Sequence, residues 1–362
     1  MPKKLKNLFF TKDSLNTFAD SIKKYYPEFD KAKFLKLIYD DTWDNLELKQ
    51  KMRHTSICLH KTLPEDYIET LVILIKVAHE IKGFEAMSLP DFVEVYGMEH
   101  WEESLNALGH FTKYYSSEFA IRPFLDKNPE LGMHYMNNWA EHEHENVRRF
   151  ASEGCRPRLP WAMALPKFKK DPALILPILE KLKDDDSEFV RKSVANNLND
   201  ISKDNPEIVL DVCERWHGKS ERTDWIVKHA CRTLLKQGNT RAMRLFGFGD
   251  PEKLEIQNLK IDKTTLKIGE SLIFSFELAN FEKQECKVRL EYAMDFVKAN
   301  GKHSRKIFQI IEKTYLPGKH VLKRKHSFVD MSTRKHYPGG HRITIIINGE
   351  EKADTLIMLK NI

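Results

Sequence analysis

A helical repeat constrains the fold of this chain more than any other feature of its sequence. The segments "ENVRRFASEG", "SEFVRKSVANNL" and "DWIVKHACRTLL" align on Val147, Val190 and Val227, at spacings of 43 and 37 residues. Another segment with apolar residues at helical spacing precedes each copy. Helix pairs at this period are typical of HEAT-like repeats, which stack into a curved solenoid. We therefore expect the second helices of the pairs to line one concave surface.

Helical patterns extend over residues 1–245. The segment "YIETLVILIKVAHEI" is too short and too charged to cross a membrane and is typical of a buried helix. Proline at the first position predicts helices that begin at Asp171-Pro172 and at Asn205-Pro206. Gly238 is expected to end the helix that contains "WIVKHACRTLLKQG".

After "LFGFGDPEK" the pattern changes to the two-residue alternation of β-strands. The segments "LEIQNLKI", "SLIFSFELAN", "CKVRLEYAMDFV", "KIFQIIEKTYL", "HVLKRKHSFV", "HRITIIING" and "KADTLIMLK" are separated by turn sequences such as Asn300-Gly301, Pro317-Gly318 and Asn348-Gly349. About seven strands predict an immunoglobulin-like β-sandwich. We expect a mostly α solenoid over residues 1–250 and an all-β sandwich over residues 251–362.

Charge and cysteine usage restrict the class of partner. The net charge is +6, but residues 253–362 hold 21 Lys and Arg against 13 Asp and Glu, a net +8, which leaves −2 for residues 1–252. This asymmetry favours a polyanionic partner, although solubility alone also accounts for it. The sequence contains no run of about 18 apolar residues, so we expect no membrane span. The five cysteines form no CxxC motif, which favours reduced thiols over a zinc site or a disulfide framework.

Three acids occupy comparable places in the helical repeats. Glu118, Glu153 and Asp200 each lie in or just after a second helix, beside Arg, Asn or Ser, so stacking would bring them to one surface. The alternative is that each is a solvated surface residue. Trp161 follows Leu-Pro in an expected loop and is either part of the site or a core anchor. Arginines suited to phosphate contacts surround these positions: Arg122, Arg148, Arg149, Arg156, Arg158 and Arg191.

Two further motifs contain histidine. "AEHEHENV" puts His142 and His144 on different helix faces and lacks the HExxH spacing, so we expect an inter-helix loop and no metal. "STRKHYPGGHR" contains Arg334 and Lys335 beside a glycine-rich turn and is a candidate DNA-contacting loop. Its alternative is a charged edge strand that resists aggregation.

Several segments together resemble the AlkC family of bacterial DNA alkylation-repair glycosylases. The resemblance covers residues 8–249, and the C-terminal sandwich is similar to the immunoglobulin-like domain that assists DNA binding in one subgroup. The matching segments are "LELKQKMRHTS", "LPDFVEVYG", "SSEFAIRPFL", "VRRFASEGCRPRLPWA", "LPILEKLKDDDSEFVRKSVANNLNDISKDNP" and "WIVKHACRTLLKQG…LFGFG".

The resemblance implies a glycosylase that removes cationic N3-alkylated bases, chiefly 3-methyladenine and 3-methylcytosine, without enclosing the base in a pocket. By motif, Glu118, Glu153, Asp200 and Trp161 fall on the active-site positions of the family. It implies double-stranded DNA as partner, no cofactor, no membrane, a monomer, and a bacterial cytoplasmic, nucleoid-associated location. The competing class is a non-catalytic repeat scaffold that binds nucleic acid or protein. Three acids among arginines favour the enzyme, because a pure phosphate binder does not need them.

Overall fold

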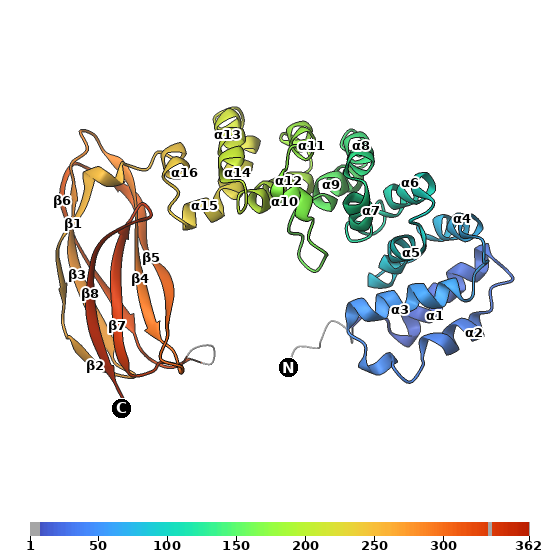
Figure 1. Cartoon of the computed structure of the whole chain (residues 1–362), viewed down its shortest axis with the longest axis horizontal. Helices are drawn as coiled ribbons and strands as arrows, with labels where there is room; N and C mark the ends of the chain where they lie inside the picture. Colours follow the sequence, from blue (N-terminus) through green and yellow to red (C-terminus); the bar gives the residue numbers. More distant parts are fainter. Residues whose placement is uncertain (1–7, 332–334, 362) are drawn as a thin grey trace. The chain divides into compact units, whose positions relative to one another are not determined.

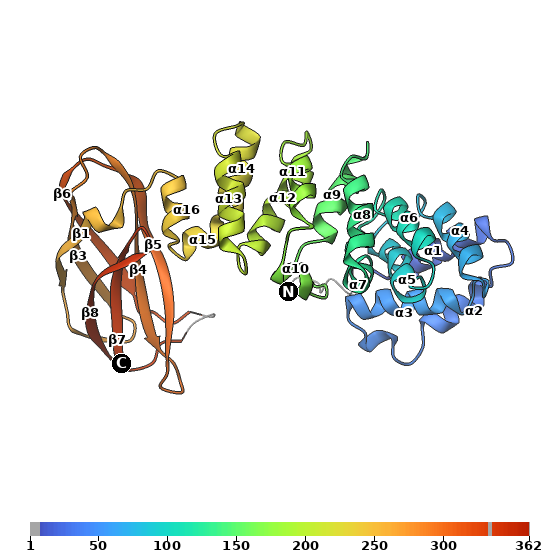
Figure 2. The ribbon, with the colours of Figure 1, turned by 45° about the horizontal axis from the view of Figure 1, so that its top comes forward.

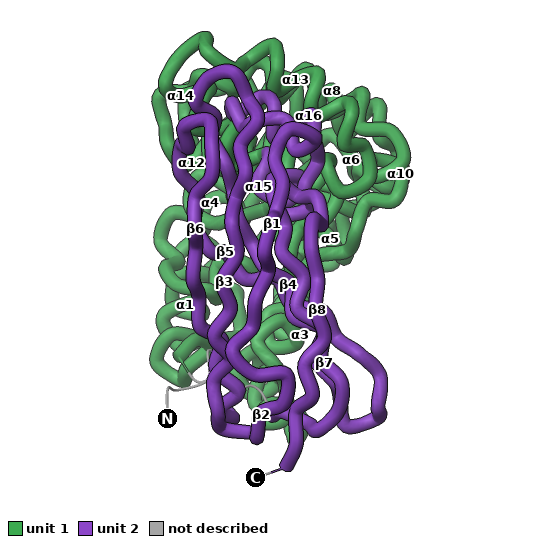
Figure 3. The backbone as a smooth tube through the Cα atoms, turned by 90° about the vertical axis from the view of Figure 1, so that its left-hand side faces the viewer, with its two compact units in different colours: residues 1–230 green, residues 231–362 purple. Residues whose placement is uncertain are grey.

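A computed structural model describes residues 8–331 and 335–361. The chain divides into two compact units, residues 1–230 and residues 231–362, which are coloured separately in Figure 3. The first unit is helical, and the second contains all the described strands. This arrangement confirms the predicted fold class. The functional boundary that we placed after residue 250 stays a prediction.

The described residues of unit 1 form α-helices and two short 3-10 helices. Its elements are α1 (Lys12–Tyr25), α2 (Lys31–Ile38), η2 (Trp43–Asn45), α3 (Leu48–His60), α4 (Tyr67–Val77), η3 (Phe84–Met87), α5 (Ser88–Tyr96), α6 (Trp101–Phe111), α7 (Arg122–Lys127), α8 (Pro129–Trp139), α9 (Glu145–Gly154), α10 (Pro166–Lys170), α11 (Leu176–Leu182), α12 (Glu188–Ile201), α13 (Pro206–Trp216) and α14 (Glu221–Ala230).

The repeat inferred from the sequence is present in unit 1. Helices α8 and α9, α11 and α12, and α13 and α14 pack as successive pairs, while α9, α12 and α14 lie side by side (Figures 1 and 2). Val147, Val190 and Val227, on which the repeats align, are all buried between these helices. The second helices of the pairs therefore form one continuous row.

The helix boundaries follow the proline signals in part. Asn205-Pro206 begins α13, as predicted. Asp171-Pro172 does not begin a helix, because the Asp171 carboxylate accepts a hydrogen bond from the Ala173 amide and so forms a turn, and α11 begins only at Leu176. The helix expected over "WIVKHACRTLLKQG" is broken at Cys231, where the two units meet along the chain.

Unit 2 contains two short α-helices and a sandwich of two sheets. One sheet has the strand order β1-β3-β6, and the other has the order β2-β8-β7-β4-β5. The elements are α15 (Arg232–Lys236), α16 (Thr240–Leu245), η4 (Pro251–Lys253), β1 (Leu254–Ile261), β2 (Thr265–Lys267), β3 (Ser271–Asn280), β4 (Cys286–Val297), β5 (His303–Tyr315), β6 (Gly318–Ser327), β7 (Gly339–Ile347) and β8 (Glu350–Lys360).

Alternating apolar residues build the core of the sandwich. Leu272, Phe274, Phe276 and Leu278 on β3 are buried and face the inner residues of β4, β7 and β8. The seven predicted strand segments all form strands, whereas the three-residue β2, which pairs in parallel with β8, was not predicted.

Two glycines allow the backbone after α15 to approach the β7–β8 hairpin closely within unit 2. Asn348 and Gly349 have φ values of 45° and 86°, as the Asn-Gly turn requires. A Cβ on Gly349 would lie 2.0 Å from the Cα of Gly238, which follows α15 and has a φ of 71°. Only glycine permits this approach of the two backbones.

Among the described helices, none combines the length and the apolar character that crossing a bilayer requires.

Candidate active site

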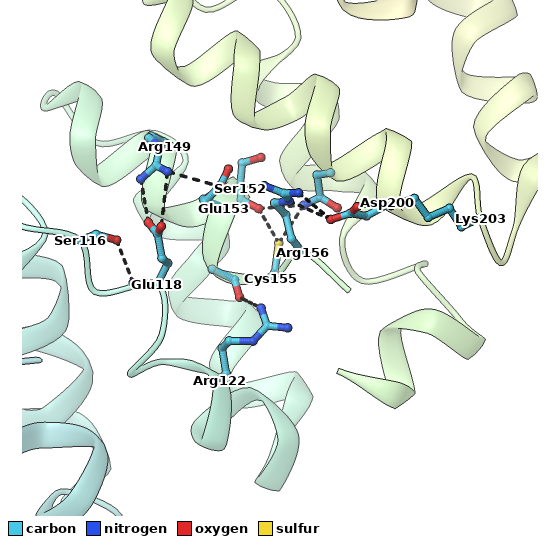
Figure 4. Close-up of polar contacts among 12 residues, drawn as sticks. Ser116, Glu118, Arg122, Arg149, Ser152, Glu153, Cys155, Arg156, Asp200 and Lys203 are labelled. Carbon is cyan, nitrogen blue, oxygen red and sulfur yellow. Dashed lines mark hydrogen bonds and ion pairs between the residues drawn. The ribbon is translucent and has the colours of Figure 1, made fainter. Parts of the chain in front are cut away.

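The three candidate acids come from neighbouring elements of unit 1. Glu118 lies in the turn that leads into α7, Glu153 lies in the last turn of α9, and Asp200 lies in the last turn of α12. Because α9 and α12 pack side by side, their C-terminal turns bring Glu153 and Asp200 together. Figure 4 shows that basic side chains lie between the acids and link them into one line.

Acids and bases alternate along this line. Arg149 Nη1 lies 2.7 Å from Glu118 Oε2, and Arg149 Nη2 lies 3.6 Å from Glu153 Oε1. Arg156 Nη1 lies 2.6 Å from Glu153 Oε1, and Arg156 Nη2 lies 2.9 Å from Asp200 Oδ2. Lys203 Nζ lies 3.0 Å from Asp200 Oδ1. We call this set the acid–base ladder, and its members are Glu118, Arg149, Glu153, Arg156, Asp200 and Lys203.

The sequence of α9 explains how one helix provides the centre of the ladder. Val147, Phe150 and Ala151 are buried in the core. Arg149 and Glu153 are four residues apart and therefore lie on one face, away from that core. Arg156 follows Glu153 by three residues, just beyond the end of the helix, and reaches across to α12.

Burial makes the charges of the ladder depend on one another. The side chains of Glu118, Glu153 and Asp200 are only 14%, 7% and 3% exposed. Buried carboxylates are stable only when they are paired, and removing one partner of such a pair costs about 3–5 kcal/mol. Burial lowers the pKa of Arg156, but Glu153 and Asp200 outweigh that effect and raise it above the ordinary value. The ladder therefore holds three carboxylates in fixed positions without a net charge.

Trp161 is exposed beside α10 and is not a core anchor. The residue is 64% exposed and lies in the loop between α9 and α10. Its φ is 65°, a left-handed conformation that costs a bulky residue on the order of 1–3 kcal/mol. The Trp161 carbonyl accepts a hydrogen bond from Lys49 Nζ at 2.6 Å. Lys49 lies in the first turn of α3, so this contact brings the start of α3 against the Trp161 loop.

Arg122 does not lie where a phosphate ligand must lie, which corrects our expectation for this residue. It is fully buried, donates from Nη1 to the Gly154 carbonyl at 3.0 Å, and donates from Nε to the Met163 carbonyl. Burial lowers its pKa to about 10, so the guanidinium is still charged at neutral pH. Arg122 supports the Trp161 loop from inside the protein.

The surface arginines already contact protein oxygens. Arg148 makes a bidentate pair with Asp185, at 2.6 and 3.0 Å. Arg158 makes a bidentate pair with Asp204, at 2.9 and 2.6 Å. Arg191 donates to the main-chain carbonyls of Asp185 and Asp186. Their role in binding phosphates stays a prediction. To bind a phosphate, each guanidinium would have to divide its hydrogen bonds between the phosphate and its present protein partner, or give up that partner.

The predicted β-domain contacts are described only in part. Arg334 lies outside the described residues. Lys335 is exposed in the segment that precedes β7.

The described residues contain no group of three or more His, Cys, Asp and Glu side chains that could hold a metal ion. His144 of the "AEHEHENV" motif instead caps α9, where its Nδ1 accepts a hydrogen bond from the Asn146 amide. All five cysteines lie in the described part of the chain and are reduced.

Sequence analysis missed several residues that shape the site. Lys203 follows Asp200 by three residues on the same helical face, a signal that was available. Lys49, Asp185 and Asp204 are far in sequence from the residues that they contact, and no local pattern identifies them.

Two family models match the chain. Residues 115–234 match the family described as "DNA alkylation repair enzyme", and residues 255–361 match "Uncharacterised protein YhaZ, C-terminal Ig-like domain". The first match contains the three acids, and the second contains the sandwich.

Two relatives match almost the whole chain. The uncharacterized protein YhaZ of Bacillus subtilis (strain 168) is 46% identical over 344 residues, which is 95% of this chain and 96% of the relative. The solved structure of the Pseudomonas fluorescens alkylpurine DNA glycosylase AlkC, bound to DNA containing an abasic site analog, is 38% identical. It has a TM-score of 0.85 and covers 99% of this chain and 100% of its own.

Proposed function

The chain belongs to the AlkC family of DNA alkylation repair enzymes, and from this membership we propose that it is a glycosylase for cationic N3-alkylated bases in duplex DNA. The proposed substrates are 3-methyladenine and 3-methylcytosine. The solved AlkC relative is described as an alkylpurine DNA glycosylase and was bound to DNA with an abasic site analog, the kind of product that base excision leaves.

The acid–base ladder is the observation that supports this proposal most strongly. A surface that only binds phosphates does not need three carboxylates in its centre, since they would repel the same backbone. Glu118, Glu153 and Asp200 are instead held by arginines in a line. Such fixed charges stabilise a cation at the moment it forms, because they need no reorganisation during the reaction.

The chemistry of the substrate provides that cation. In an N3-alkylated nucleotide the base carries the positive charge, so the bond from C1′ to the base nitrogen breaks with its electrons passing to the base, which leaves neutral. Positive charge then moves to the deoxyribose as an oxocarbenium ion, which the carboxylates stabilise. The oxygen of a water bonds to C1′, and a carboxylate accepts its proton. We propose that the exposed Trp161 packs against the deoxyribose of the lesion.

This mechanism contains no general acid and therefore favours charged bases. A neutral base requires protonation to leave. The proposed mechanism uses the ladder acids to stabilise positive charge and assigns no residue to protonate a leaving base. Enclosing the base in a pocket is not needed either, since selectivity arises from the charge of the base and not from its shape.

We further propose that the protein acts as a monomer in the bacterial cytoplasm, in association with the nucleoid, and requires no cofactor. Residues 251–362 assist DNA binding, with Arg334 and Lys335 among the contacts. The proposed partners of phosphates near the lesion are Arg148, Arg149, Arg156, Arg158 and Arg191. Of these, Arg156 is buried between Glu153 and Asp200 and would have to exchange one of these partners for a phosphate.

Release of free base from methylated duplex DNA tests this function. The purified full-length protein is incubated with the DNA, and small molecules are analysed by liquid chromatography and mass spectrometry. We expect free 3-methyladenine and 3-methylcytosine. Tight binding without release of either base would instead favour the non-catalytic scaffold.

A further inference from the structure

We propose that Lys49 is a positioning residue that holds Trp161 in its strained, exposed conformation and couples the Trp161 loop to the turn that carries Glu118. The inference rests on the proposed function for its kinetic test, but the contact itself is testable without activity. Lys49 lies in α3, outside the elements that carry the acid–base ladder.

A single ammonium group connects the two segments. Lys49 Nζ donates to the Trp161 carbonyl at 2.6 Å and lies 4.6 Å from the centroid of the Phe119 ring, where cation–π attraction is effective. Phe119 is the residue after Glu118, the first acid of the ladder. Lys49 therefore links the exposed tryptophan to the backbone that positions a candidate catalytic carboxylate.

The strain at Trp161 explains why the loop needs such a contact. A non-glycine residue with a φ of 65° stays in that conformation only where its surroundings fix it. Arg122 holds the Met163 carbonyl from the buried side, and the Leu165 amide donates to the Pro157 carbonyl at 3.1 Å to close the loop. Lys49 holds the Trp161 carbonyl from the other side, at the strained residue itself.

The place of Lys49 in its helix supports a tertiary role. It is the second residue of α3, and the positive end of the helix dipole disfavours a cation in the first turn. Its ammonium contacts a main-chain carbonyl and an aromatic ring, both from distant parts of the chain. Local helix stability therefore does not explain a lysine here, whereas the contacts to Trp161 and Phe119 do.

The test uses a double-mutant cycle with a matched control. Lys49→Met removes the ammonium and keeps the stem, Lys49→Arg restores a charged donor, and Lys61→Met removes one exposed lysine from the other end of the same helix. Single-turnover excision is measured for each of these variants, for Trp161→Ala, and for Lys49→Met combined with Trp161→Ala. Thermal melting verifies that every variant is folded.

We expect Lys49→Met to lower the excision rate by on the order of tenfold to a hundredfold, the scale of misplacing one group at a reacting centre. DNA affinity and its salt dependence should stay as in the wild type, Lys49→Arg should recover much of the rate, and Lys61→Met should have no effect. In the Trp161→Ala background, Lys49→Met should cause no further loss, because both changes remove the same positioning effect.

Two results would overturn the inference, one from binding titrations and one from excision kinetics. If Lys49→Met reduces the slope of log K against log salt by about 0.9, Lys49 binds a phosphate and does not act through Trp161. If its effect multiplies that of Trp161→Ala, the two residues act independently.

A spectroscopic measurement separates this inference from the proposed function. The protein is labelled with 5-fluorotryptophan, and Trp161→Phe assigns the resonance of Trp161 in the fluorine NMR spectrum. We expect Lys49→Met to shift or broaden that resonance and Lys61→Met to leave it unchanged. An unchanged resonance in Lys49→Met refutes the contact, whether or not the wild type excises a base, while a wild type without excision refutes only the proposed function.

Discussion

Glu153 lies at the centre of the ladder, where Arg149 and Arg156 both contact its Oε1. Such a carboxylate cannot move toward a substrate without losing both partners. We propose that it acts as a fixed negative charge, toward which the cationic sugar of the substrate is brought. The reactive geometry is then a property of the folded protein before DNA binds.

Neutralising a ladder acid should slow excision more than it weakens binding. We expect Glu153→Gln and Asp200→Asn each to lower the single-turnover rate by about 10² or more, a loss of about 3 kcal/mol in transition-state stabilisation. DNA affinity should hold or rise, because a negative charge is removed beside a polyanion. Single-turnover kinetics with separate binding titrations measure both quantities. Full activity in both folded variants would contradict the catalytic assignment.

Buried and surface arginines should differ in their salt dependence. Arg122→Met should lower the excision rate while leaving the slope of log K against log salt unchanged, because Arg122 is buried against main-chain carbonyls. Arg158→Met should weaken DNA binding and reduce that slope by about 0.9, since its guanidinium is at the surface. Salt titrations of both variants measure this. A smaller slope in Arg122→Met would contradict this and show that Arg122 contacts a phosphate.

At the residue level, the sequence predicted which acids lie close together better than it predicted where each arginine lies. The repeat puts Glu118, Glu153 and Asp200 at comparable places, and the structure brings them into one line. The burial of Arg122 depends on carbonyls 32 and 41 residues away, a kind of contact that no local pattern contains.

At the scale of elements, repeat register and strand alternation made most of the fold predictable. The aligned valines have equivalent buried positions in α9, α12 and α14, and each predicted strand segment forms a strand. The failures are short or local. Strand β2 spans three residues and shows too little alternation to recognise, and the Asp171 side chain competes with helix initiation by forming a turn.

The contact between Gly349 and Gly238 predicts a difference between two hairpin glycines. Gly349 and Gly301 have similar positive φ values, 86° and 75°, but a Cβ at Gly301 meets no atom within 4 Å. Gly301→Ala should lower the free energy of unfolding by about 1–2 kcal/mol through backbone strain alone. Gly349→Ala should lower it by an additional ~1–3 kcal/mol, because the backbone of Gly238 has no space for the methyl group.

Urea unfolding of the two variants, followed by circular dichroism in the β region of the spectrum, measures this difference. Equal destabilisation would mean that the hairpin and the end of α15 move apart at little cost.

At the scale of the whole molecule, charge is divided between the two units. Residues 231–362 hold 25 Lys and Arg against 15 Asp and Glu, a net +10, which leaves −4 for residues 1–230. The unit that contains the acids is thus the less favourable one for a polyanion. From this division we propose that unit 2 provides much of the attraction to DNA and that unit 1 carries out the chemistry.

Removing unit 2 should therefore separate binding from catalysis. A truncation after Ala230 follows the division between the units, whereas one after Asp250 would leave α15 without the hairpin that it contacts. We expect DNA affinity to fall by one to several orders of magnitude, with a smaller salt slope. Saturating DNA should restore part of the excision rate, because the ladder is intact. Unchanged affinity and slope would show that the basic charge of unit 2 has another purpose.

The most direct test of the central claim compares two duplexes that differ at one position. One carries 3-methylcytosine, whose base is cationic, and the other carries uracil, whose base is neutral. Each is incubated with excess protein under single-turnover conditions, and alkali-induced strand cleavage counts the abasic sites. Carboxylates that stabilise an oxocarbenium ion without a general acid should produce abasic sites only in the 3-methylcytosine duplex. Efficient excision of uracil, or no excision from either bound duplex, would contradict the account.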